Sequence, residues 1–479
     1  MAKKTYIGDA DSLAALVKKM YLGVGTESGG IINVGVARKV KKLYIGDPNG
    51  VAKLVFQSEK DPGSVSISPT SIILNGSTLS KIITVSRLGS GAITAKSSNT
   101  SVATVSVSST RVTVKSVDYT SGTATITITV AEDDDYKQVS VTCPITADFS
   151  IEYYGTTSED IGYRHYTAAA SIGDYALFGG GSTGDSIRDD VYAYNSSLTR
   201  STATEMGQPK FQHAASSNGV YALFGGGSYD FGVSRTSSTV YAYDKSLTMT
   251  RTSSNLIGSG YDLLAAAAFG DYVLFGGGSR FSSSSTGYRS NIDIYDKTLT
   301  KRVASLSVAR DNLAAASNSS YVLFGGGDNG NLVDTVEAYD TSLTRTIPTA
   351  LSSSRYGLSA ARAGDYIMFY GGGDYVDMYN KSLTRSFISQ KAYHGSAGVT
   401  YNNHAVFAGG TTLSSKPTSY SSVISFDSSL TMMTLANLAS SAGYLGAAIA
   451  GEFLLFGGGG KGLQTSGANS GTVSVYTMS

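Results

Sequence analysis

The sequence lacks the features that several large classes of protein require. Its 479 residues include no Trp, one Cys, four His and seven Pro, and 37 Lys and Arg balance 36 Asp and Glu. The single thiol, Cys143, excludes a disulfide framework and a zinc site built from several cysteines of one chain. A formal net charge of +1 is unlike the strongly basic face of a nucleic-acid-binding protein, so we expect no nucleic-acid partner.

Long hydrophobic runs are also missing. The longest, such as LLAAAAF at 263–269, fall far short of the roughly 20 apolar residues that a membrane-spanning helix needs. Near the N-terminus, Lys18 and Lys19 interrupt the only apolar stretch, so we expect neither a membrane span nor an export signal. With 41% hydrophobic residues, the composition is that of a folded chain.

Residues 1–62 differ from the rest because Lys and Arg outnumber Asp and Glu there. Asp11 and Ser12 can cap a short helix over LAALVKKMYL, and residues 47–50 (DPNG) predict a turn between two strands. A segment this small buries little by itself, so we expect it to pack against something else. Its lysines fit either a solvated surface or a contact with another protein.

Residues 63–147 predict an all-β sandwich. Runs such as KIITVSR, RVTVKSV and TATITITVA alternate apolar and polar residues and are separated by turns. The pattern SNTSVATVSVSSTRVTVKSV…GTATITITV resembles bacterial immunoglobulin-like domains of group 2. The acidic run 132–135 predicts an exposed hairpin turn, with a calcium site as the alternative, and Cys143 predicts a small buried side chain.

A repeat fills residues 148–479. The string YALFGGG at 175–181 recurs six more times, the last copy being LLFGGGG at 454–460. An aromatic strand follows each copy, such as VYAYN at 191–195 or VEAYD at 336–340, and six of the seven continue into SLT or TLT. A small-residue strand, the LFGGG strand, the aromatic strand and an SLT strand make units of four strands, which predicts seven blades of a β-propeller.

The apolar–Gly–Gly strand with its downstream aromatic strand resembles kelch repeats, although the later Trp is missing and a third Gly is present. The last unit ends where its SLT strand should begin, and an unassigned segment, FSIEYYGTT at 149–157, precedes the first unit. We therefore expect 149–157 to complete the seventh blade beside VSVYT at 473–477. Pairing the two ends removes exposed strand edges.

Candidate binding residues lie at the start of each unit's first strand. One position there is small in all seven units: Ala168, Ala214, Ala265, Ala314, Ser359, Ala397 and Gly446. Just before it, two positions carry mostly cationic and aromatic residues: Arg164, His165, Lys210, Phe211, Tyr261, Asp262, Arg310, Asp311, Arg355, Tyr356, Tyr393 and His394, with Ala442 and Gly443 in the seventh unit.

This ring would lie at the mouth of the central channel, on the face with the long variable loops. It predicts a polar ligand held by Arg and Tyr side chains, such as a glycan or an acidic surface polymer. The alternative is that these side chains only pin neighbouring blades together through loop carbonyls.

Catalytic signatures are not recognisable. The four His have no HExxH spacing, strands rather than helices follow the GGG runs, and the only Cys lies outside the repeat. Copper oxidases built on propellers use a Tyr, His and Cys constellation, and sialidase-type propellers carry Asp-box motifs, which are missing here. We expect no enzymatic activity, no cofactor and no metal.

The segment ARKVKKLYIGDPNGVAKLVF at 37–56 resembles the opening segments of structural proteins from tailed phages of Gram-positive bacteria. That resemblance implies a virion fibre or decoration protein: residues 1–62 bind other virion proteins, 63–147 form a spacer, and the propeller binds a host-surface glycan or protein. Such a protein is made in the host cytoplasm and released by lysis. By analogy with fibres we expect a homo-oligomer, most often a trimer. A bacterial surface adhesin and a kelch-type protein scaffold are the alternatives.

Overall fold

The structure is a computed structural model, and every regular element among its described residues is a β-strand. It describes residues 60–479 except 232–234, 259, 282–285, 414–416 and 461–470, and before residue 60 only the backbone of six short strands. No helix in this described part has the length and apolarity to cross a membrane. By internal contacts the chain forms two compact units, the second comprising 74–79, 116–122 and 147–479.

The six N-terminal strands form three antiparallel pairs. They are β1 (Tyr21–Leu22) with β4 (Arg38–Lys39), β2 (Glu27–Ser28) with β3 (Ile31–Ile32), and β5 (Lys42–Gly46) with β6 (Ala52–Gln57). The β5–β6 pair flanks residues 47–50, which confirms the two strands predicted around DPNG. The helix expected after Asp11 lies outside the described residues.

Two four-stranded sheets follow. One contains β10 (Ile93–Ser97), β13 (Gly122–Val130), β14 (Val139–Ala147) and β8 (Ile72–Leu74), in that order. The other contains β11 (Ala103–Ser108), β12 (Arg111–Ser116), β9 (Ser80–Arg87) and β7 (Val65–Ser68). Alternate residues of β13 are buried, as its apolar–polar alternation predicts. Cys143 on β14 is fully buried, and burial raises its pKa.

The acidic run 132–135 connects β13 to β14. The Asp133 carboxylate accepts hydrogen bonds from the backbone N–H groups of Ser90, Asp135 and Tyr136, which lower its pKa. Among the described residues no group of three or more His, Cys, Asp or Glu side chains could hold a metal ion. Through its three hydrogen bonds, the carboxylate of Asp133 orders the turn.

Seven further four-stranded antiparallel sheets lie in the described part of 148–479. Their strands, in order within each sheet, are: β16 (Ala168–Ile172), β17 (Tyr175–Gly179), β18 (Val191–Tyr194), β19 (Arg200–Ala203); β20 (Ala214–Ser217), β21 (Ala222–Gly225), β22 (Val240–Tyr243), β23 (Met249–Arg251); β24 (Ala265–Phe269), β25 (Tyr272–Gly276), β28 (Asn291–Tyr295), β29 (Lys301–Ser305); β30 (Ala314–Ser317), β31 (Val322–Gly325), β32 (Val336–Tyr339), β33 (Arg345–Thr346); β34 (Ser359–Ala363), β35 (Tyr366–Tyr370), β36 (Gly373–Tyr379), β37 (Arg385–Ala392); β38 (Ala397–Tyr401), β39 (His404–Ala408), β40 (Val423–Phe426), β41 (Met432–Leu435); and β42 (Gly446–Ala450), β43 (Phe453–Gly457), β44 (Ser474–Met478), β15 (Ile151–Thr156). We number these sheets one to seven. A small hairpin, β26 (Ser279–Phe281) with β27 (Thr286–Tyr288), extends from sheet three.

The SLT motif forms a turn, which corrects the expectation that it is a strand. In all six copies the fourth strand begins immediately after the motif, and the motif's Leu has a φ of 59° to 64°. In sheet four, the Asp340 carboxylate accepts hydrogen bonds from the N–H groups of Ser342 and Thr344, at 2.8 and 2.9 Å. Leu343 packs against the core, which offsets the cost of its left-handed backbone.

The first strands of the seven sheets contact one another in chain order, and β42 of the last sheet contacts β16 of the first. A second contact links sheets one to five and joins sheet seven to sheet one, because the glycine that ends the second strand lies against a Phe of the next sheet. A Cβ at Gly225 would lie 2.9 Å from Phe275, and one at Gly457 would lie 3.1 Å from Phe178 of sheet one. At these five contacts a larger side chain would force the sheets apart, which explains the glycine there.

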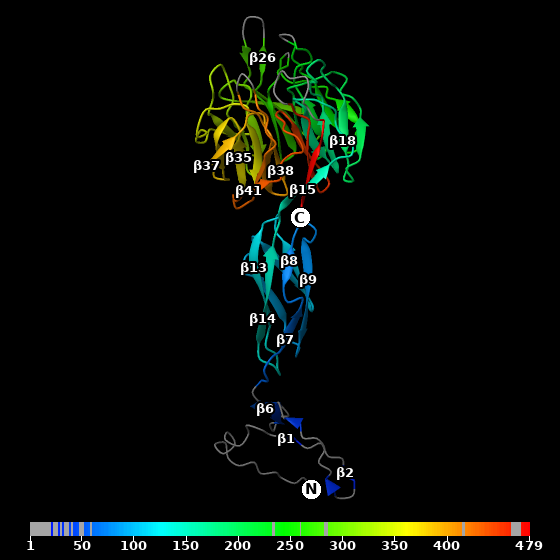
Figure 1. Ribbon diagram of the computed structural model, residues 1–479. Coiled ribbons are helices and arrows are strands. Elements are labelled where there is room, and N and C mark those ends of the chain that lie inside the picture. Colours follow the sequence, from blue (N-terminus) through cyan, green and yellow to red (C-terminus); the bar gives the residue numbers. More distant parts are fainter. Residues whose placement is uncertain are drawn as a thin grey trace. The chain divides into compact units, whose positions relative to one another are not determined.

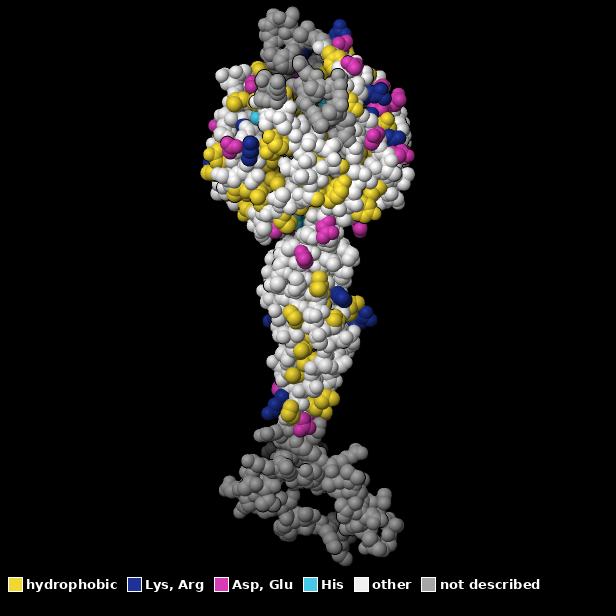
Figure 2. Space-filling view, viewed as in Figure 1, with side chains coloured by type: hydrophobic (Ala, Val, Ile, Leu, Met, Phe, Trp, Pro, Cys, Tyr) yellow, Lys and Arg dark blue, Asp and Glu magenta, His cyan; other side chains and the backbone are white. Residues whose placement is uncertain are grey.

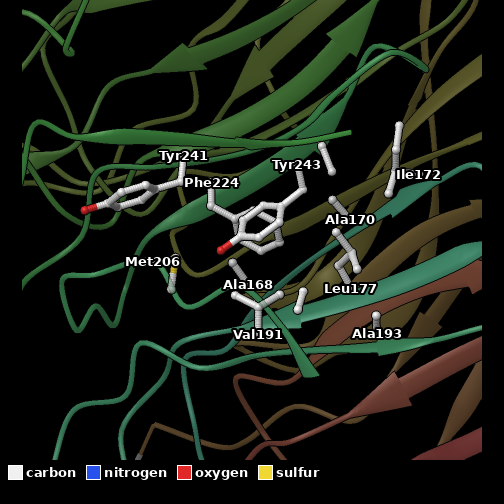
Figure 3. Close-up of a cluster of buried hydrophobic side chains, with 12 residues drawn as sticks. Ala168, Ala170, Ile172, Leu177, Val191, Ala193, Met206, Phe224, Tyr241 and Tyr243 are labelled. Carbon is white, nitrogen blue, oxygen red and sulfur yellow. The ribbon is translucent and has the colours of Figure 1, made fainter. Parts of the chain in front are cut away.

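Hydrophobic clusters fill the spaces between neighbouring sheets. Figure 3 shows the cluster between sheets one and two, in which Leu177 and Val191 of sheet one lie near Phe224 and Tyr243 of sheet two. A corresponding cluster joins sheet seven to sheet one. In sheet seven, β15 pairs with β44 from Ile151↔Met478 to Thr156↔Ser474, and Figure 1 shows the C-terminus beside β15. Residues 151–156 thus occupy the place expected for 149–157.

Candidate functional site

Seven turns, one before each first strand, lie side by side. We call them the central turns. Each contains one residue with a φ of 51° to 64°; in chain order these residues are Tyr166, Gln212, Leu263, Asn312, Gly357, Gly395 and Tyr444. Backbone hydrogen bonds join them in chain order: the N–H groups of Leu263, Asn312, Gly357, Gly395 and Tyr444 each donate to the carbonyl of the preceding central turn. The N–H of Tyr166 donates to the carbonyl of Tyr444 at 2.9 Å, so the first and last turns are neighbours.

The glycine loops reach the same place. The N–H of Gly181 donates to the carbonyl of Lys210 in the next sheet, and the N–H of Gly459 donates to the carbonyl of Arg164. His165 and Ser182 exchange two backbone hydrogen bonds, both of 2.9 Å. The predicted ring residues and the loops that follow the glycines therefore meet around the central turns.

The three arginines of the predicted ring are buried and bind carboxylates of their own sheets. The pairs are Arg164–Asp190, Arg310–Glu337 and Arg355–Asp377, with N–O distances of 2.7, 3.1 and 2.7 Å. At most 2% of each arginine is exposed. Their guanidinium groups therefore bind carboxylates inside the sheets and are not presented to a ligand. The sequence had predicted that these arginines would hold a polar ligand.

Lys210 and Tyr261 occupy the same position in sheets two and three and are equally buried. The Nζ of Lys210 donates to the carbonyls of Gly226 and Thr239, at 3.1 and 2.7 Å, and burial holds its pKa well below the usual value. The hydroxyl of Tyr261 donates to the carboxylate of Asp293. Lys210 thus bonds loop carbonyls, as the alternative prediction has it, but in its own sheet rather than in a neighbouring blade, whereas Tyr261 bonds a carboxylate on strand β28 of its own sheet.

In sheets six and seven this position is not cationic. The ring of Tyr393 stacks on that of Tyr420, with 3.7 Å between centroids, and Ala442 is buried.

The next predicted position divides into acidic and aromatic members. Asp262 and Asp311 are buried, and their carboxylates accept hydrogen bonds of 2.5 Å from the hydroxyls of Ser228 and Ser279, which lie in the loops of the preceding sheets. Burial is the main cause that raises the pKa of Asp262 to about 6, and it also raises the pKa of Asp311.

The aromatic members of that position surround the central turns. Phe211, Tyr356 and His394 are half-buried, and His165 is 8% exposed. The rings of Tyr356 and His394 lie 5.1 Å apart, and that of His165 lies 5.4 Å from Tyr166. Burial lowers the pKa of both histidines, so near neutral pH they are uncharged and present polar nitrogens. Gly443 of sheet seven is buried and has no side chain to offer.

A cavity of about 160 Å³ opens among the central turns of sheets six, seven, one and two. Its wall consists of Tyr166, Thr167, Gln212, His213, Gly395, Ser396, Tyr444 and Leu445. The rings of Tyr166 and Tyr444 lie 4.3 Å apart, and Tyr444 lies over Gly395, where a Cβ would approach within 2.6 Å of the ring. Glycine at 395 therefore leaves the room that the tyrosine pair needs.

These cavity residues were not predicted from the sequence, because they lie one and two positions after the residues selected there. A signal was present: the residue immediately before the first strand is Leu in four sheets but Thr167, His213 and Ser396 in the other three. A polar residue in place of a repeated apolar one marks a position that packing alone does not explain.

On the face shown in Figure 2, Lys and Arg side chains are interspersed with Asp and Glu, with no extended patch of one sign among the described residues. The cavity among the central turns, which polar and aromatic side chains line, is the candidate site.

Comparison with known proteins adds little to this geometry. The sequence matches no protein-family model and no curated protein. Among solved structures, one titled "Structure of YjhT" is similar, with a TM-score of 0.45 and 12% sequence identity over 67% of this chain and 95% of that chain.

Proposed function

We propose that residues 148–479 form a closed seven-bladed β-propeller of kelch-like type and that residues 63–147 form an immunoglobulin-like sandwich. Contacts in chain order between the first strands, with β42 against β16, support closure. Three separate contacts join the two ends of the repeat. They are the hydrogen bond from Tyr166 to Tyr444, the contact of Gly457 with Phe178, and the pairing of β15 with β44. The two sheets with alternating burial support the sandwich.

We propose further that the protein is a non-enzymatic phage fibre or decoration protein whose propeller binds the host surface. The observation that carries this function is the cavity lined by the Tyr166–Tyr444 pair, because aromatic rings beside hydrogen-bonding groups suit a sugar. Residues 1–62 would attach the chain to other virion proteins, and the immunoglobulin-like part would act as a spacer. The virion is then its location, and a homo-oligomer its expected state.

The test uses the full chain and a variant without residues 1–62. Labelled full chain should bind at least one strain in a panel of Gram-positive bacteria, and the shortened variant should bind equally well. In phage particles that carry the protein, the shortened variant should no longer be incorporated. Failure of the full chain to bind any strain, or normal incorporation without residues 1–62, would contradict the proposal.

A further inference from the structure

The repeat departs from its own pattern in the wall of the cavity. In four sheets the residue immediately before the first strand is a leucine that packs against a glycine of the preceding sheet: Leu264, Leu313, Leu358 and Leu445. The packing is close, because a Cβ added at Gly226 would lie only 2.7 Å from the side chain of Leu264. Packing at this position therefore favours an apolar side chain. Thr167, His213 and Ser396 replace the leucine in sheets one, two and six, and all three line the cavity.

Two of these replacements bury polar atoms that the fold does not satisfy. The Thr167 hydroxyl has no hydrogen-bond partner, and the His213 ring has at most a weak bond to the Gly179 carbonyl, which leaves at least one ring nitrogen without a partner; the two residues are only 6% and 7% exposed. A buried polar group without a partner is destabilising, so the fold gains nothing from the polar atoms of these two side chains. A ligand that enters the cavity would supply the missing partners.

A row of aromatic rings leads from the cavity to the rim. From Tyr444 the row continues to Tyr166 at 4.3 Å, to Phe211 at 6.3 Å and to Phe231 at 5.5 Å between centroids. Phe231 is 55% exposed, although most large apolar side chains of the repeat are buried. Neighbouring rings are tilted or meet edge to face, so they present apolar surface in several directions, and a chain of sugars can contact one ring after another.

Charge around the site favours an uncharged ligand. The basic side chains next to the cavity already have partners in the protein: Arg164 binds Asp190, and Lys210 donates to two carbonyls. Farther around the central turns lie the buried carboxylates of Asp262 and Asp311. An anionic polymer would find no free cation among these described residues, whereas sugar hydroxyls can both donate to and accept from Thr167, His213 and Gln212.

We propose that the cavity binds the terminal sugar of an uncharged glycan through Thr167 and His213, with the following sugars along Tyr166, Phe211 and Phe231. This rests on the proposed host-surface binding and specifies its ligand class. The cavity, at about 160 Å³, is smaller than the roughly 300 Å³ or more of pockets for drug-sized ligands, which fits one sugar ring.

The test combines a glycan array with three variants of the full chain. His213→Leu introduces the residue that four other sheets have at this position, and Thr167→Val replaces the hydroxyl with a methyl group. Both variants should therefore fold with an unchanged or raised melting temperature. On an array of neutral, uronate-bearing, sialylated and phosphorylated glycans, the best ligands should be neutral. Each of the two variants should weaken the best neutral oligosaccharide about three- to tenfold in calorimetric titration, as the loss of one hydrogen bond predicts.

Phe231→Ala should weaken a longer oligosaccharide but not its terminal disaccharide, and Phe387→Ala is the matched control, because Phe387 is 49% exposed and lies outside the row. A preference for anionic glycans, no glycan binding, or unchanged affinity in the His213 and Thr167 variants would overturn the inference. If the full chain still binds host cells in any of these cases, the proposed function stands and only the ligand assignment is wrong. If it binds no host cell, the proposed function itself is wrong.

Discussion

The Arg310–Glu337 pair allows a direct test of whether the buried arginines of the predicted ring stabilise the fold rather than bind a ligand. Neither side chain is exposed, and the Glu337 carboxylate accepts hydrogen bonds from Arg310 at 3.1 Å and from the N–H and hydroxyl of Ser307 at 3.0 and 2.6 Å. Arg310→Leu would leave a buried carboxylate without its cation. Removing one partner of a buried pair costs about 3–5 kcal/mol, and because the Ser307 bonds remain we expect about 3 kcal/mol.

The repeat itself provides the compensating change. Sheet three places Tyr261 and Asp293 at the positions of Arg310 and Glu337, and the tyrosine hydroxyl donates to the carboxylate. The double variant Arg310→Tyr with Glu337→Asp should therefore recover about 2 kcal/mol relative to Arg310→Leu. A recovery of this size is comparable to the interaction energies found between contacting residues, about 0.5–3 kcal/mol.

Urea denaturation of the full chain at pH 7 measures both effects. Because the chain has no Trp and all but five of its 32 Tyr lie in residues 148–479, the near-ultraviolet tyrosine signal follows the seven-sheet unit. A loss below about 1 kcal/mol in Arg310→Leu, or a double variant no more stable than the single one, would refute a structural role. Loss of ligand binding with unchanged stability would restore Arg310 to the predicted ligand-binding ring.

Three further predictions concern other parts of the same unit. Because burial raises the pKa of Asp262 to about 6, the folded state holds a proton that the unfolded chain releases, so stability should fall by up to about 3 kcal/mol as pH rises from about 4 to 7; urea titrations at pH 4, 5.5 and 7 should show this fall, and Asp262→Asn should remove it. Asp340→Ala should cost about 1 kcal/mol in the same assay by leaving two turn N–H groups to water, whereas Asp340→Asn should cost nothing, since sheets one and five carry Asn at this place; equal losses would disprove the turn role. Deletion of 149–157 exposes the edge of β44 and should lower the melting temperature and cause concentration-dependent aggregation in light scattering; unchanged melting would show that β15 is dispensable.

The sequence permitted prediction of the repeated elements because their causes are local. Glycine is needed where a sheet approaches the next sheet's Phe, and alternating apolar residues predict buried strands. The SLT turn was misassigned because Leu rarely adopts a positive φ, and here packing of that Leu against the core overrides the backbone preference. Strand β10 was not predicted, because ITAKS has one large apolar residue, and even its inward-facing positions are only half-buried.

The direction of the ring side chains could not be predicted from their spacing. Spacing placed Arg310 and Arg355 near the central turns, but an acid inside the sheet draws each guanidinium inward. In sheets four and five that acid is the second residue of the aromatic strand, Glu337 or Asp377, whereas Arg164 of sheet one binds Asp190, which precedes its aromatic strand. The acid therefore does not stand at one fixed place in the repeat, and the spacing alone does not identify it.

Departures from a repeat indicate function only when the fold does not account for them. Tyr370 stands where sheets one to four have a glycine, yet it stacks on Phe407 at 4.7 Å and so contributes to packing between sheets. His213 also departs from the repeat, but it puts a buried and incompletely bonded imidazole where four other sheets have a well-packed leucine. Since those sheets show that leucine fits this position, stability alone would favour leucine. An incompletely bonded histidine beside a cavity is therefore better explained by binding than by folding.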